Sequence, residues 1–143
     1  MNDFKTGLPE SLVKAYRSTN YEVHTDPAFI IKIGEFSSGL RNLFRKLNLS
    51  TGYFITACNP QGIELSNAKN RSLHNALRND LQSSGHQIVN GFGSDPSGTW
   101  DGEPSFLVLG ISLGQAKSLA VKFKQNAIVG CDETCIPDLL LLR

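Results

Sequence analysis

Apolar residues recur at helical spacing in several stretches of the chain. In residues 37–47, leucine and phenylalanine occupy positions i, i+3, i+4 and i+7 of one face, and a serine at the start can cap the helix. The other face carries Arg41, Arg45 and Lys46, which we expect to face water rather than a phosphate. The same spacing predicts helices over residues 9–18, 66–84 and 113–124.

Shorter apolar runs between these helices predict strands. Residues 21–24 and 29–33 flank the turn sequence Thr25-Asp26-Pro27, and this pattern predicts a hairpin. The leucines of residues 139–142 predict an edge strand or a packed tail. Further strands are predicted over residues 53–58, 87–90, 106–111 and 126–130.

The order of these elements predicts an α/β fold that borders on α+β. Strand, helix and strand follow one another over residues 53–90 and again over residues 106–130, and crossovers of this length join parallel strands. We therefore expect a single domain over residues 1–143, with a mixed sheet, two βαβ crossover units, an amino-terminal hairpin and about four helices. Residues 1–8 are expected to be disordered.

Residues 91–105, between the two crossover units, are the least regular part of the pattern. They combine glycines, prolines and acidic residues with Phe92 and Trp100, the only tryptophan. Loops of this length without secondary structure are usually functional or disordered, and this one is too apolar for a plain disordered linker. We interpret it as a structured lid that the fold brings towards the end of strand 53–58.

Composition narrows the class of protein without indicating an activity. Hydrophobic residues make up 40% and charged residues 19% of the 143 residues, as in folded globular domains. A net charge of +1 does not favour binding to nucleic acid or to an anionic membrane. No signal peptide or membrane span is visible, and three cysteines in a chain of this size fit a reducing compartment, so we expect a cytoplasmic protein.

Neither common nucleotide-binding fingerprint is present. Residues 91–93 read Gly-Phe-Gly, but Pro96 stands at the third glycine position and no helix begins there. Cys131 and Cys135 have no nearby histidine, and buried thiols explain the cysteines better than a three-cysteine zinc site with Cys58 does. A nucleophilic Cys58 is a further alternative. Its base would be one of the histidines, His24, His74 or His86. The sequence implies no metal and no cofactor.

Polar residues gather where strand 53–58 is expected to end. Asn59 follows this strand, and ligands of open α/β sheets lie outside the carboxyl ends of strands. Asn67 and Asn70 fall in the first turn of the next helix, where free amides attract anions. Together with the loop they predict a site for a small anionic or nucleotide-like ligand. The expected ligand-binding residues are Asn59, Asn67, Asn70, Trp100, Ser105, Gln125 and Asn126.

Catalysis at this site would depend on the carboxylates of the loop. Glu103 is the expected general base, and Asp95 would orient it or bind a metal ion. The structural alternative is that Trp100 closes the edge of the core, Asp95 forms an Asx-turn and Glu103 pairs with a surface cation. A different function remains open, in which the loop and the leucine-rich tail form a surface for a protein partner or a homodimer.

Several short motifs, taken in order, resemble a bacterial family known as domain of unknown function 3293. They are FITACNP at residues 54–60, Asn70, GFGSD at 91–95, WDGEPSF at 100–106, QNAI at 125–128 and the Ile33-Gly34 pair. The similarity covers roughly residues 15–142. It implies a small cytosolic bacterial protein with no established activity. The family tends to have an aromatic residue at the position of Cys58, which argues against a nucleophilic role for this cysteine.

Overall fold

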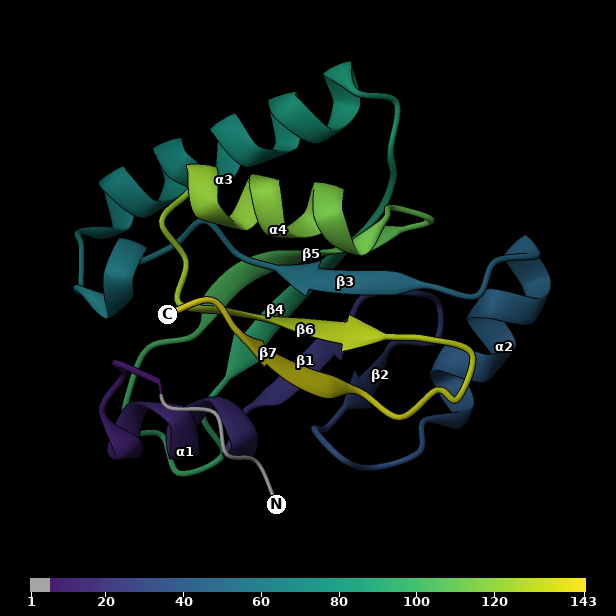
Figure 1. Cartoon of the computed structure of the whole chain (residues 1–143), viewed down its shortest axis with the longest axis horizontal. Helices are drawn as coiled ribbons and strands as arrows, with labels where there is room; N and C mark the ends of the chain where they lie inside the picture. Colours follow the sequence, from purple (N-terminus) through teal and green to yellow (C-terminus); the bar gives the residue numbers. More distant parts are fainter. Residues whose placement is uncertain (1–5) are drawn as a thin grey trace.

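The computed structural model describes residues 6–143, which form a seven-stranded sheet, four α-helices and a short 3₁₀ helix (Figure 1). Residues 1–5, part of the segment expected to be disordered, lie outside the described residues. The helices are α1 (Glu10–Ser18), α2 (Ser38–Leu47), η1 (Pro60–Gly62), α3 (Asn67–Ser83) and α4 (Leu113–Lys122). The strands are β1 (Asn20–Val23), β2 (Phe29–Ile31), β3 (Gly52–Ile55), β4 (Gln87–Ser94), β5 (Glu103–Leu109), β6 (Ala127–Cys131) and β7 (Asp138–Leu141).

The strands lie in the order β2-β1-β4-β5-β3-β6-β7, and every neighbouring pair is antiparallel. Strands β3 and β4 run parallel to each other, but β5 lies between them; β5 and β6 are likewise parallel and separated by β3. Each crossover is therefore a split βαβ unit, and the segment from β3 to β6 has the connectivity of a ferredoxin-like fold. The β1–β2 hairpin and β7 extend this core at its two edges.

This topology confirms the predicted fold class, the two crossovers, the hairpin and the helices. It differs from the expected mixed sheet in that no two neighbouring strands within residues 6–143 are parallel. The reason is that each crossover spans one intervening strand, which runs in the opposite direction. Segment length and periodicity predict a crossover but do not determine whether it joins adjacent strands.

Helices α2, α3 and α4 each begin after a serine that caps the first turn, and each buries apolar residues on one face. The Ser37 hydroxyl accepts a hydrogen bond of 3.1 Å from the Leu40 amide at the start of α2. Ser112 and Gln115 form a reciprocal capping box at the start of α4. Within residues 6–143, no helix is long and apolar enough to cross a membrane.

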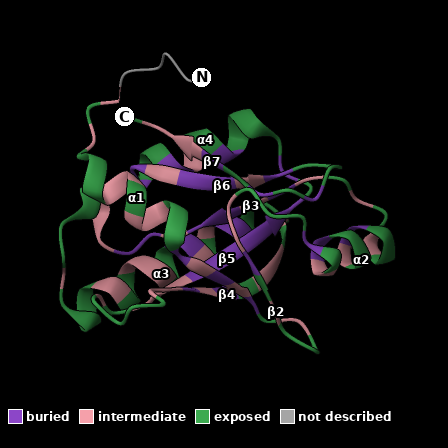
Figure 2. Ribbon diagram, turned by 90° about the horizontal axis from the view of Figure 1, so that it is seen from below, coloured by how far each residue is buried: buried purple, intermediate pink, exposed green. Residues whose placement is uncertain are grey.

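The sheet has two differently covered faces. Helices α3 and α4 lie side by side over one face (Figure 1), where Leu77, Phe106 and Ala120 belong to one buried cluster. The other face packs at one end against α2, where Leu40 and Phe44 join the second cluster. Figure 2 shows the sheet as the buried centre of the molecule, with exposed residues concentrated on the helices and turns.

The face that contacts α2 is concave because the two edges of the sheet approach each other. The Gly34 amide donates to the Pro137 carbonyl at 2.8 Å, and the Ser37 amide donates to the Cys135 carbonyl at 2.8 Å. These bonds connect the segment after β2 to the segment before β7, which are the edge strands at opposite ends of the sheet. The sheet is thus curled into a partly closed barrel, and α2 fills one end of it.

The predicted lid over residues 91–105 is shorter than expected, because both of its ends belong to strands. Residues 91–94 continue β4, and Gly93 pairs with Glu103 at the start of β5. Glycine fits this strand for a steric reason: a Cβ on Gly91 would lie 2.6 Å from the Phe54 ring. The irregular connection is reduced to residues 95–102.

Candidate functional site

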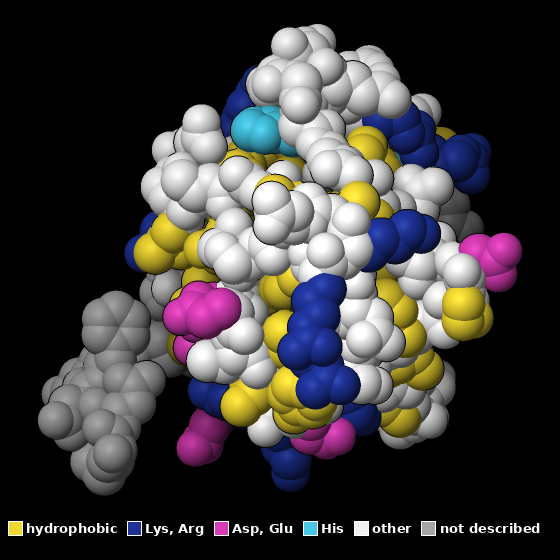
Figure 3. Space-filling model, turned by 90° about the vertical axis from the view of Figure 1, so that its right-hand side faces the viewer, with side chains coloured by type: hydrophobic (Ala, Val, Ile, Leu, Met, Phe, Trp, Pro, Cys, Tyr) yellow, Lys and Arg dark blue, Asp and Glu magenta, His cyan; other side chains and the backbone are white. Residues whose placement is uncertain are grey.

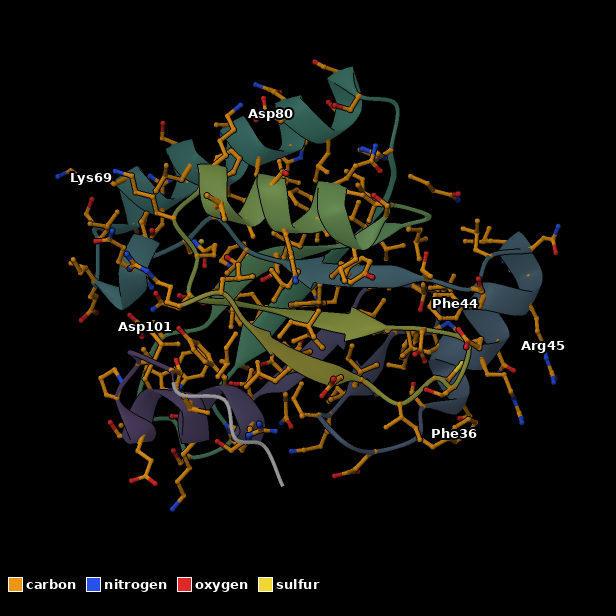
Figure 4. The ribbon with its side chains drawn as sticks, in the orientation of Figure 1. Phe36, Phe44, Arg45, Lys69, Asp80 and Asp101 are labelled. Atoms are coloured by element: carbon orange, nitrogen blue, oxygen red, sulfur yellow. The ribbon has the colours of Figure 1, made fainter. Side chains whose placement is uncertain are left out.

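A cavity of about 450 Å³ occupies the end of the concave face that α2 leaves uncovered. Every strand except β2 contributes to it, and α1, the turn after β3 and the 95–102 connection surround its mouth. In Figure 4, Asp101 lies near α1, at the end of the sheet opposite Phe44 on α2. The apolar part of the wall includes Leu12, Tyr21, Phe54, Val129 and Leu139. Mouths of β-barrels are common sites for small ligands.

Asn59 organises the polar side of this cavity. It follows β3 in a left-handed conformation, with φ 48° and ψ 61°, and its carbonyl accepts from the Gly62 amide at 2.8 Å. The Asn59 amide donates to Asn70 Oδ1 at 2.9 Å, while Asn59 Oδ1 accepts from Asn70 Nδ2 and from the Leu65 amide, both at 2.9 Å. Two donors on Oδ1 fix the orientation of the side-chain amide. Its Nδ2 must therefore face the remaining partner, Glu103.

Glu103 accepts a hydrogen bond of 2.7 Å from Asn59 Nδ2 at its Oε2. Burial raises the pKa of its carboxyl above the usual value, and the bond from Asn59 offsets part of this rise. The carboxylates that line the cavity are Glu64, Asp101 and Glu103, whereas the lining contains no Lys, Arg or His among residues 6–143. The predicted pairing of Glu103 with a surface cation is therefore absent from the described part of the chain. The electrostatic character of the site is acidic.

Tyr16 brings α1 to the same cavity. Its hydroxyl accepts from Asn126 Nδ2 at 3.2 Å, and its carbonyl accepts from the Tyr21 hydroxyl at 2.6 Å. Burial is the main reason that the pKa of Tyr16 is raised, and the nearby charge of Glu103 raises it further. Asn126 is buried behind Tyr16, and its Oδ1 has no partner within residues 6–143. The two tyrosines therefore contribute neutral phenols and aromatic surface to the site.

The 95–102 connection is shaped by Asp95, whose carboxylate accepts from backbone amides of the connection itself. Oδ1 accepts from the Ser97 amide at 2.9 Å, and Oδ2 accepts from the amides of Thr99 at 2.8 Å and Trp100 at 3.3 Å. Desolvation raises the pKa of Asp95, but the hydrogen bond of 2.8 Å from the Ser97 hydroxyl and the three amide bonds together outweigh it and hold the pKa below its usual value. This arrangement is that of an Asx-turn, in which Asp95 positions the segment carrying Trp100.

Cys58 lies beside the cavity, but its environment does not activate it. The side chain is buried, and Sγ lies 3.7 Å from the Pro104 carbonyl. Burial raises the pKa of the thiol to about 11, so it is protonated at neutral pH. No histidine lines the cavity within residues 6–143, and His74 stacks on Phe106 on the opposite face of the sheet. The geometry therefore argues against Cys58 as a nucleophile.

The cysteines are also not arranged for zinc. Cys131 and Cys135 belong to the cluster beneath α2, whereas Cys58 lines the cavity at the other end of the concave face. Within residues 6–143, no group of three or more His, Cys, Asp or Glu side chains is placed to hold a metal ion. A three-cysteine site is thus incompatible with this fold.

Most of the residues predicted from the sequence to form a site meet at this cavity. The lining includes Asn59, Asn67, Asn70, Trp100, Glu103, Ser105 and Gln125. Asp95 and Asn126 stand one layer behind it, through Trp100 and Tyr16 respectively. Gln125 also ties the backbone, because its Nε2 donates to the Cys58 carbonyl at 3.1 Å.

Sequence reasoning did not identify the contributions of Tyr16, Glu64 and Asp101. The apolar spacing predicts the helix that carries Tyr16, but it does not show that this helix covers a cavity. Glu64 and Asp101 lie in irregular segments, where periodicity gives no orientation. The surplus of acidic residues in the segments flanking Asn59 and Trp100 was the available signal.

Residues 55–128 of the 143-residue chain match the model of a family described as protein of unknown function (DUF3293). The matched region runs from the end of β3 to β6, and it contains the Asn59–Glu103 pair and the 95–102 connection. Comparisons with curated proteins and with solved structures gave no match.

Proposed function

The chain belongs to the DUF3293 family, and we propose that it binds a small, partly apolar molecule in the cavity at the open end of its curled sheet. The observation that carries this proposal is a half-open cavity of about 450 Å³ whose polar groups are already held in place. Ligand cavities range from roughly 300 to 1,000 Å³ and combine apolar walls with a few fixed polar groups. The Glu103–Asn59–Asn70 chain supplies these groups without rearrangement.

The charge of the lining changes which ligand is favoured. An anionic or nucleotide-like ligand was expected from the helix start at Asn67. Such a ligand would face Glu64, Asp101 and Glu103, and no cation among residues 6–143 lines the cavity to offset them. Like charges in a partly desolvated site repel strongly. A neutral or cationic ligand therefore fits the cavity better than a phosphate does.

Catalysis remains a prediction that rests on Glu103. Its raised pKa and its position in the wall suit a general base that acts on a bound molecule. Asp95 does not line the cavity, so its proposed role is to position the connection rather than to orient the base. The bacterial source and the cytoplasmic location inferred from the sequence also stay predictions.

A fragment screen by thermal shift tests ligand binding. Hits at 100 times their Kd should stabilise the protein by about 2.7 kcal/mol. The matched variant is Gly93→Val, because Gly93 lines the cavity and an added Cβ would meet Thr19 Cγ2 at an ordinary 3.6 Å. This variant should fold and lose the shifts. Gly114→Ala, where a Cβ meets nothing within 4 Å, is the control that keeps them. Equal shifts in all three proteins would contradict the proposed site.

A second candidate function is self-association at the α2 end. The leucine-rich tail, expected to supply an apolar surface for a partner, packs largely inside the protein. Leu139 is buried, and Leu140 packs against the core beneath α3 and α4. Phe36 and Ile136, which are 54% and 44% exposed, instead lie in the joined segments beside α2. Figure 3 views this end and shows Lys and Arg side chains beside hydrophobic groups. Light scattering should show a dimer that Phe36→Ser dissociates; a monomer at all concentrations would exclude this function.

A further inference from the structure

We propose that the ligand of this cavity carries a cationic nitrogen, a primary ammonium or an amidinium, that pairs with the Glu103 carboxylate. This inference rests on the proposed function and specifies the chemical class of the ligand. It follows from the hydrogen bonds that Glu103 makes, from those it lacks, and from the aromatic groups around it.

The Glu103 carboxylate is only partly satisfied by the protein. Asn59 Nδ2 supplies one donor to Oε2, and no other group within residues 6–143 donates to the carboxylate. An ionised carboxylate has room for about four donors. A partly buried carboxylate that lacks donors and a counter-charge is costly to keep ionised. A ligand ammonium would supply both the missing donors and the missing charge.

The residues around Glu103 that the structure describes do not supply the missing donors or the missing positive charge. The Asn59 side-chain amide is fixed in orientation, because its Oδ1 accepts from Asn70 Nδ2 and from the Leu65 amide. It therefore offers Glu103 only the hydrogen bond from Nδ2. The other carboxyl side chains that line the cavity within residues 6–143 are Glu64 and Asp101, so they add acidic groups rather than a cation. The lining therefore provides an acceptor and a negative potential at a fixed place, and the described part of the chain contributes no cation to it.

The rest of the wall suits the remainder of such a molecule. Tyr16 and Trp100 line the same cavity and offer aromatic faces, which attract cations as well as apolar groups. Leu12, Phe54 and Val129 add apolar wall to the cavity. The ligand expected from this arrangement is an amine attached to a small apolar or aromatic body.

Three probes of one shape separate charge from size: phenethylamine, 2-phenylethanol and phenylacetate, which are cationic, neutral and anionic near pH 7.5. Binding is followed by ¹H–¹⁵N NMR at the indole N–H of Trp100, the only tryptophan of the chain. The amine should bind at least about 10-fold more tightly than the alcohol, and the acid should bind most weakly.

The variant Glu103→Gln keeps an acceptor for Asn59 and removes the charge. It should reduce the preference for the amine over the alcohol to within about 3-fold while the affinity for the alcohol is unchanged. Glu133→Gln, which removes an equal charge at an exposed position outside the cavity lining, is the matched control and should retain the preference. In the wild type, affinity for the amine should fall as the pH is lowered through the pKa of Glu103, whereas affinity for the alcohol should not.

The outcomes distinguish this inference from the proposed function. Equal binding of the three probes, or an amine preference that survives in Glu103→Gln, would overturn the assignment of a cationic ligand and leave a neutral ligand site in place. Absence of any Trp100 perturbation by all three probes would overturn both. Circular dichroism on each variant establishes that it is folded before its affinities are compared.

Discussion

Asn59 shows how one residue can link backbone geometry to the site. The left-handed conformation at this position favours asparagine over most residues, and the same side chain then joins Leu65, Asn70 and Glu103. The sequence indicates that the element before Asn59 ends there, because Pro60 restricts the backbone of the residue before it. It could not indicate the partner of Asn59, because Glu103 is distant in the chain and the pairing depends on the strand order.

The Asn59→Ala variant should lose about 2–3 kcal/mol of unfolding free energy, because the Leu65 amide and the Glu103 carboxylate lose their partners together. Urea denaturation measures this change. Asn67→Ala is the matched control, since Asn67 is exposed, and its cost should stay within about 0.5 kcal/mol. A similar loss in both variants would show that the Asn59 network contributes little.

Glu103 should make stability depend on pH in a defined direction. Burial places its folded-state pKa above the unfolded value, so the folded protein binds the proton more readily. The resulting penalty is fully present above the folded-state pKa and disappears as the pH falls towards the unfolded value. Glu103→Gln should therefore be more stable than the wild type at neutral pH, and this difference should shrink as the pH falls towards about 4.3.

Urea denaturation of both proteins at several pH values gives this difference directly. Subtracting the wild type from the variant cancels the opposite contributions of Asp95 and Asp132, whose pKa values are lowered in the folded state. A difference that does not change with pH would contradict a raised pKa for Glu103.

At the scale of the element, the β4–β5 hairpin is where the sequence pattern misled most. The glycines of residues 91–93 predict a loop, yet they lie in a paired strand. Glycine is required at position 91 because the Phe54 ring and the Glu22 carbonyl approach it, at 2.6 Å and 2.8 Å from a Cβ placed there. The amphipathic helices were predictable because their caps and periodicity are local, whereas this close approach is a tertiary contact.

Two alanine variants in the same strand separate these roles. Gly91→Ala should cost about 1–3 kcal/mol, because its Cβ would overlap a buried ring and a backbone oxygen. Gly93→Ala should cost less than about 1 kcal/mol, because its nearest contact is an ordinary 3.6 Å. Thermal denaturation compares them. Equal costs would indicate that both glycines serve only backbone flexibility.

At the scale of the whole molecule, the curl of the sheet creates the cavity. The ferredoxin-like core alone presents one helix-covered face and one open face. The added β1–β2 hairpin and β7 bring the segments at Ser37 and Cys135 together, and α2 then fills one end of the concave face. The other end stays open beneath α1 and forms the cavity.

Several residues that line the cavity could be singled out from the sequence because they follow a strand end or begin a helix, and ligands of open α/β sheets bind near such positions. Asn59, after β3, and Asn70, in the first turn of α3, are examples. The enclosing groups were not predictable in the same way. Tyr16 reaches the cavity only because α1 lies across the open end of the curl, which depends on strand order and sheet closure rather than on local pattern.

The most direct test of the proposed ligand site is an NMR titration of the wild type and of Gly93→Val with 2-phenylethanol, followed at the indole signal of Trp100. The neutral probe carries no charge to interact with Glu103. In the variant, the added Cβ makes only ordinary contacts and the side chain takes up part of the cavity that Gly93 lines. The expected result is a saturable shift of the Trp100 signal in the wild type that is absent in the variant. A shift of equal size and midpoint in both proteins, or none in the wild type, would contradict ligand binding in this cavity.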